Sequence, residues 1–107
     1  MAVRELVQDR GNEVLISAAC AWEIATKARI GKLLGVQRLL ADFDQLMAAD
    51  NFTHLPMTHR HALLGGSFDV PHRDPFDRML AAQAVLEGAT LLTNDAQLSM
   101  FEIATHW

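Results

Sequence analysis

The chain has 107 residues, half of them apolar, with thirteen acidic against nine basic residues and a formal net charge of −4. This length fits a single domain over residues 1–107, and the apolar fraction excludes an intrinsically disordered chain. The acidic balance argues weakly against a nucleic-acid-binding protein that relies on a broad basic surface.

The cysteine content and the hydropathy pattern set the expected compartment. Cys20 is the only cysteine, which excludes an internal disulfide and fits a reducing environment. No apolar run approaches the roughly 20 residues of a membrane span. The N-terminus carries no apolar signal segment. We expect a cytoplasmic protein with no membrane association.

The first half of the chain is predicted to alternate helices and a strand. The spacing over Val3–Val7 predicts the end of a helix, and Glu13–Ser17 is a β-branched run typical of a buried strand. Ser17 is then expected to cap a helix over Ala18–Ile30 that a glycine ends. Apolar residues at three- and four-residue intervals predict one further amphipathic helix over Leu33–Ala49.

The next segment is predicted to hold a strand and two helices. Phe52–Met57 reads as a strand, and its proline places it at an edge or near its end. A short helix over Thr58–Leu64 is expected to stop at Gly65-Gly66. Asp74-Pro75 then opens an Ala-rich helix, which Gly88 is expected to end.

The chain is predicted to finish with two strands. The apolar run Leu91–Thr93 forms one strand, a helical turn over Ala96–Met100 follows, and Phe101–Thr105 forms a weak last strand. This alternation favours an α/β fold with a mostly parallel sheet.

Three carboxylates, those of Glu23, Asp77 and Asp95, are predicted to lie near the carboxyl edge of that sheet, where ligands of open α/β sheets gather. Carboxylates that share a cleft repel one another unless a cation lies between them. Oxygen ligands without His or Cys select Mg²⁺ or Mn²⁺. The chemistry this favours is metal-assisted phosphodiester hydrolysis, which the spacing alone does not establish.

Each acid also has a structural interpretation that the residues leave open. Glu23 precedes Lys27 by four residues, the spacing of an exposed helical ion pair. Asp74 before Pro75 suits a helix N-cap, and Asp77 suits the positive end of the helix dipole. Asp95 suits a cap for the turn that follows it.

The basic residues near these acids have two interpretations of equal weight. Lys27, Arg73 and Arg78 are candidates for RNA-binding contacts to phosphate, and they also balance the acidic charge.

His59, His61 and His72 with Cys20 match no common zinc pattern. The aromatic side chains are expected to fill the core rather than stack on bases; they are Trp22, Phe43, Phe52, Phe76 and Phe101.

Three sequence blocks carry a family resemblance. They are Ser17–Lys27 with Gly31-Lys32-Leu33, then His72–Arg78, and then Thr93–Asp95. In this order they resemble the VapC-like branch of the PIN-domain family, over nearly the whole chain from Asn12 onward. The resemblance implies a PIN-like three-layer α/β/α fold and Mg²⁺- or Mn²⁺-dependent endoribonuclease activity. It also implies a toxin of a type II toxin–antitoxin pair, with an RNA substrate, a cognate antitoxin and a homodimer.

The resemblance also assigns residues. Glu23 matches the second acid of the family, Asp77 the third and Asp95 the fourth. Asp74 matches a recurring acid that caps the helix or supports a ligand. Thr93 and Asn94 match the polar residues beside the last acid.

One departure from the family pattern concerns the start of the chain. The hydrophobic strand that ends in the first acid is missing, so we expect an N-terminally truncated domain without its central first strand. We expect impaired catalysis, and self-association through open sheet edges or the neighbouring helices. The alternative is a non-catalytic remnant that acts only as an antitoxin-binding or dimerisation module. An unrelated small α/β domain would need three coincident blocks.

Overall fold

The computed structural model describes residues 2–107 and divides the chain into two compact units. The N-terminal unit is Arg10–Pro56, and the C-terminal unit comprises the chain up to Asp9 together with Met57–Trp107. The elements in chain order are α1 (Val3–Gln8), β1 (Val14–Ser17), α2 (Ala18–Arg29), α3 (Gln37–Ala41), α4 (Phe43–Ala49), β2 (Phe52–Leu55), α5 (His59–Ser67), α6 (Pro75–Glu87), β3 (Leu91–Leu92), the 3₁₀ helix η1 (Ala96–Phe101) and β4 (Thr105–His106).

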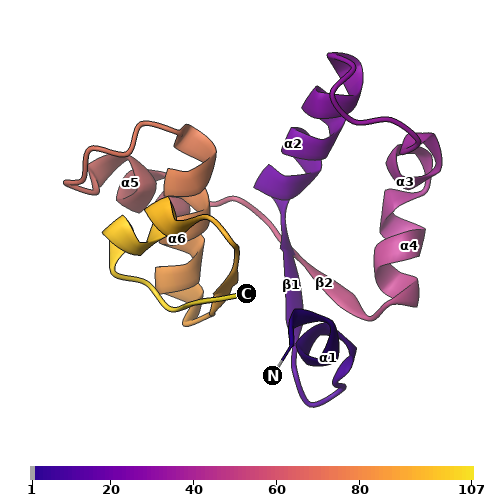
Figure 1. Cartoon of the computed structure of the whole chain (residues 1–107), viewed down its shortest axis with the longest axis horizontal. Coiled ribbons are helices and arrows are strands. Elements are labelled where there is room, and N and C mark those ends of the chain that lie inside the picture. The colour runs from indigo at the N-terminus through magenta and orange to yellow at the C-terminus, as the bar shows by residue number, and fades with distance from the viewer. Residues whose placement is uncertain (1) are drawn as a thin grey trace. The chain divides into compact units, whose positions relative to one another are not determined.

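The N-terminal unit is built on two parallel strands. β1 pairs with β2 in a register that sets Val14 opposite Phe52 and Ser17 opposite Leu55. The strands lie side by side in both views, and α2, α3 and α4 form the connection between them (Figure 1). Ser17 starts α2 as predicted, since its Oγ accepts the Ala19 N–H at 3.1 Å. The helix is followed by Gly31 at φ +79°, a conformation that favours glycine.

Two expectations for this unit were wrong. The stretch predicted as one helix is interrupted at Asp42, whose φ of −117° and ψ of 31° are not helical, so α3 and α4 are separate. Trp22 was expected in the core, yet its side chain is 57% exposed. Apolar spacing predicts which residues share a helix face, but it does not say whether that face is covered.

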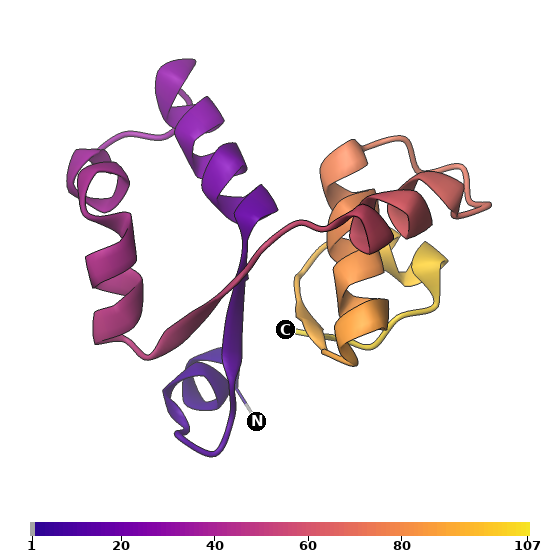
Figure 2. The same cartoon turned by 180° about the vertical axis from the view of Figure 1, so that it is seen from behind.

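The C-terminal unit packs around α6. β3 and β4 form a parallel pair, with Leu91 opposite Thr105 and Leu92 opposite His106. The segment from β3 to β4 runs alongside α6 (Figure 2). Asp74 caps the start of this helix, and Gly88, at φ +61°, ends it. The buried core comprises Ala81, Leu98 and Phe101, with Phe68, Val70, Leu91 and Ile103 packed against it.

Helix α5 is tied to α6 through a buried histidine. Thr58 and His61 form a capping box at the start of α5, in which His61 Nδ1 accepts the Thr58 N–H at 3.1 Å. The proton of the neutral ring therefore lies on Nε2, which donates to Glu87 Oε1 at 2.9 Å. His61 thus fixes both the first turn of α5 and its position against α6.

The predicted end of α5 at Gly65-Gly66 was wrong, because the helix continues to Ser67. Gly65 has a packing role instead. A Cβ at this position would lie 3.2 Å from the Arg78 carbonyl oxygen and 3.4 Å from Met79 Sδ. The glycine therefore lets α5 approach the backbone of α6 closely.

Both strand pairs are parallel and each is connected through helices, which confirms the predicted α/β class. None of the helices in the described part of the chain is both long and apolar enough to cross a membrane.

Candidate active site

Two of the predicted acids lie at the start of α6. Asp74 is the N-cap, and its Oδ1 accepts the Phe76 N–H at 2.9 Å, while Pro75 is the first helical residue. Asp77 follows in the first turn. Its carboxylate therefore lies where the exposed N–H groups of the helix favour negative charge.

The carboxylate of Asp77 is held by a histidine that sequence reasoning set aside. His72 Nε2 lies 2.7 Å from Asp77 Oδ2, and the side chains are 8% and 21% exposed. The His72 ring meets Phe101 edge to face, with 5.5 Å between ring centroids. The only sequence signal for this pair was a histidine in the loop just before an acidic first helical turn.

Arg78, predicted as a candidate phosphate contact, directs its guanidinium at the backbone of the chain itself. Nε donates to the Gly65 carbonyl at 2.8 Å, and Nη1 donates to the carbonyls of Val70 at 3.2 Å and His72 at 2.8 Å. Nη2 donates to the carbonyls of Phe68 and Gly66. Arg78 thereby holds the segment Gly65–His72 against α6. A phosphate contact at Arg78 stays a prediction.

Asp95 follows β3 and begins η1. Its Oδ1 accepts the Gln97 N–H at 2.9 Å, and its own N–H donates to Thr93 Oγ1 at 3.1 Å. Asn94 between them is exposed. Asp95 therefore caps η1 in the structure, and the capping hydrogen bond uses only one of its carboxylate oxygens.

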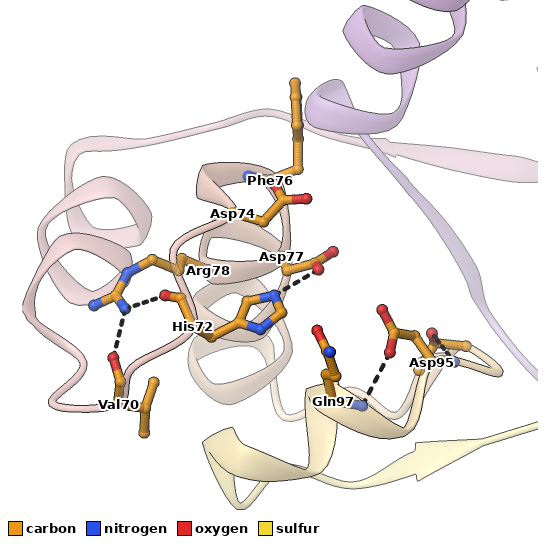
Figure 3. Close-up of polar contacts among 9 residues, drawn as sticks. Val70, His72, Asp74, Phe76, Asp77, Arg78, Asp95 and Gln97 are labelled. Carbon is orange, nitrogen blue, oxygen red and sulfur yellow. Dashed lines mark hydrogen bonds and ion pairs between the residues drawn. The ribbon is translucent and has the colours of Figure 1, made fainter. Parts of the chain in front are cut away.

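Figure 3 shows the carboxylates of Asp77 and Asp95 on the same side of the C-terminal unit, one from the start of α6 and one from the end of β3. Hydrogen bonds within the described residues use Oδ2 of Asp77 and Oδ1 of Asp95. The other oxygen of each carboxylate is a ligand atom of the kind that Mg²⁺ and Mn²⁺ prefer. The residues present therefore fit such an ion in kind, although no group of three His, Cys, Asp or Glu side chains suited to a metal is found among residues 2–107.

Glu23, the remaining predicted acid, lies on α2 in the N-terminal unit. Lys27 Nζ lies 2.9 Å from Glu23 Oε1, and the side chains are 51% and 38% exposed respectively. An exposed pair of this kind contributes about 0.3–0.5 kcal/mol to stability. Glu23 and Lys27 thus form an ion pair within their own unit, and the pair uses Oε1 of Glu23 rather than Oε2.

The electrostatics of α2 also affect a thiol. Burial raises the pKa of the Cys20 thiol, the negative charge of Glu23 raises it further, and a hydrogen bond with the Ser17 backbone works in the opposite direction. Arg73, the third basic candidate, is exposed at the loop before α6.

Comparison with known proteins gives one match. A family model described as PIN domain matches residues 1–103, nearly the whole chain. The chain matches no curated protein and no solved structure.

Proposed function

This chain belongs to the PIN-domain family, and from that premise we propose that it is a divalent-metal-dependent endoribonuclease. The observation that carries the proposal is the family match over residues 1–103, which supports a nuclease-type function. The carboxylates of Asp77 and Asp95, on one side of the C-terminal unit, add the donor chemistry that such an enzyme needs.

In the proposed mechanism, acidic side chains hold Mg²⁺ or Mn²⁺ through carboxylate oxygens. Asp77 and Asp95 are the proposed ligands in the C-terminal unit. A ligand role for Glu23, on α2 in the N-terminal unit, rests on the family resemblance alone. Such an ion, when bound, activates a water and offsets negative charge on the phosphodiester. A carboxylate oxygen of the same set accepts the proton of the attacking water. Thr93 supports the backbone at Asp95, because its Oγ1 accepts the Asp95 N–H.

The proposed biological role is that of the toxin in a toxin–antitoxin pair, with RNA as the substrate and a homodimer as the working form. This role is supported by the three sequence blocks that resemble VapC-like proteins and by their order. The exposed Arg73 is the basic residue best placed among the candidates to contact RNA phosphate, because the Arg78 guanidinium is already bonded to backbone carbonyls.

The test is cleavage of a fluorescent single-stranded RNA in Mg²⁺ or Mn²⁺, compared with the same reaction in chelator. Asp95→Asn is the informative variant, because asparagine caps a helix as well as aspartate does and the start of η1 is retained. We expect cleavage that needs the ion and falls at least about 100-fold in Asp95→Asn. Asp74→Asn, which keeps the cap of α6, is the matched control and retains activity.

Three outcomes would contradict the proposal. Cleavage that persists in chelator, or that is unchanged in Asp95→Asn, would mean that the acids do not serve the reaction. An inactive wild-type chain that still binds an antitoxin would favour the non-catalytic binding module instead.

A further inference from the structure

We propose that His72 is a positioning residue for Asp77: it holds one carboxylate oxygen so that the other is directed to the divalent ion. This inference rests on the proposed function, because it concerns the same metal-binding acid. It assigns a role to a histidine that neither the acidic pattern nor the basic pattern of the sequence includes.

The contact between the two side chains is short and largely shielded from water. His72 Nε2 lies 2.7 Å from Asp77 Oδ2, with the histidine side chain 8% exposed. An ionised carboxylate only accepts hydrogen bonds, so the proton of this contact lies on Nε2. A charge-assisted hydrogen bond of this length fixes the direction of the carboxylate plane.

The ring of His72 is itself held in place by packing. Its edge-to-face partner Phe101 is buried in the core, and Phe101 meets Phe68 at 5.1 Å between centroids. Rotation of the imidazole away from Asp77 would therefore disturb an aromatic cluster as well as break a hydrogen bond.

The backbone of His72 is fixed from the same helix turn. The His72 carbonyl accepts from Arg78 Nη1 at 2.8 Å, and Arg78 follows Asp77 directly in α6. The loop and the helix are thus joined in both directions, once through the His72 carbonyl and once through its ring. Figure 3 shows both contacts, one made by the ring of His72 and one by its carbonyl.

The consequence concerns the oxygen that His72 does not touch. Among the described residues, Asp77 Oδ1 has no hydrogen-bond partner, while Oδ2 is held by the histidine. Partners that orient a ligating side chain typically change metal affinity 10- to 100-fold when removed. A residue that only stabilised the start of α6 would have no such effect on the ion.

The experiment measures Mn²⁺ affinity of the full chain by electron paramagnetic resonance, alongside urea unfolding. His72→Phe keeps a ring beside Phe101 and removes the donor, whereas His72→Gln keeps an amide donor near the Nε2 position. The matched control is His61→Phe, which removes the contact between a buried histidine and the carboxylate of Glu87 in the same unit. We expect His72→Phe to weaken Mn²⁺ binding about 10- to 100-fold. We expect His72→Gln to recover most of the affinity and His61→Phe to lower stability alone.

A second measurement needs no variant. In the ¹⁵N-labelled wild-type chain, Mg²⁺ is expected to shift the Nε2–H resonance of His72 with the same midpoint as its binding, and to leave that of His61 unchanged. A His72 resonance that does not respond at saturating Mg²⁺ would overturn the inference, as would equal Mn²⁺ affinity in wild type and His72→Phe.

These outcomes separate the inference from the proposed function. If wild type cleaves RNA with Mg²⁺ while His72→Phe binds Mn²⁺ normally, only the role of His72 fails. If wild type binds Mn²⁺, loses affinity in His72→Phe and cleaves no RNA, the nuclease proposal fails and the role of His72 stands. A wild-type chain that binds no Mn²⁺ overturns the role of His72 as well.

Discussion

Gly65 is hydrogen-bonded to Arg78 and lies against its backbone. Arg78 Nε donates to the Gly65 carbonyl at 2.8 Å, and a Cβ built on Gly65 would lie 3.2 Å from the Arg78 carbonyl oxygen. Helices α5 and α6 therefore meet here at backbone distance, with one side chain of α6 bonded to the last turn of α5. The start of α6, where Asp74 and Asp77 lie, depends on this contact for its position in the unit.

The two adjacent glycines of α5 are expected to respond oppositely to alanine. At Gly66 a Cβ would meet nothing within 4 Å. Gly66→Ala should therefore raise the free energy of unfolding by about 0.5–1 kcal/mol through helix propensity. Gly65→Ala brings a Cβ against the backbone of α6, and overpacking costs of about 1–3 kcal/mol exceed that gain. Urea unfolding of both variants checks the prediction. A stabilised Gly65→Ala would mean that α5 can move away from α6 at little cost.

Arg78→Lys is expected to destabilise the chain by about 2–4 kcal/mol. The substitution keeps the charge, but an ammonium group is a single point with three donors and does not reproduce the guanidinium fork that bonds five carbonyls. The measurement is the urea midpoint at unchanged m-value. Arg73→Lys, at the exposed arginine five residues earlier, is the control and should stay within about 0.5 kcal/mol of wild type.

Arg73 is expected to affect RNA binding rather than stability. The slope of log K against log salt is negative. If the Arg73 guanidinium neutralises one phosphate, Arg73→Ala makes this slope less steep by about 0.7, the value for one contact to a single strand. Binding of a non-cleavable RNA between low and moderate salt measures this slope. An unchanged slope would assign Arg73 to charge balance around the acids.

Cys20 is expected to alkylate slowly at neutral pH. Burial and the negative charge of Glu23 raise the pKa of its thiol, and the thiolate is the reactive form. A raised pKa leaves less thiolate at a given pH, so the rate with iodoacetamide should rise only at a pH above the midpoint of an ordinary cysteine. Glu23→Gln removes the charge and should shift the midpoint of Cys20 labelling to lower pH. Fast labelling of wild type at pH 7 would contradict the expected burial.

Local signals in the sequence predicted three helix ends, whereas the last strand, predicted over Phe101–Thr105, is Thr105–His106. Ser17 and Asp74 cap helices because a side-chain oxygen reaches an N–H only two residues away, and Gly88 ends α6 in a conformation that glycine adopts readily. These interactions are complete within a few residues, so the sequence alone contains them. The same reasoning failed at Gly65, where the glycine serves a contact with another helix.

The environment of the candidate site was harder to predict for the same reason. The acids Asp77 and Asp95 stood out in the sequence because each adjoins a predicted helix start or strand end. The roles of His72 and Arg78 depend on how the loop before α6 folds back on the helix, and neither role has a fixed spacing. The sequence therefore predicted a phosphate contact for Arg78 and did not contain the signal for its carbonyl partners.

The way Arg78 holds the segment Gly65–His72 has a practical consequence for protein engineering. Its partners are backbone carbonyl oxygens, which every amino acid residue has. These hydrogen bonds therefore do not depend on which side chains the solvent-facing positions of the segment carry. Asp69 is such a position. A cysteine placed there in a Cys20→Ser background offers an attachment point for a fluorescent dye on the segment before α6, with the loop conformation preserved.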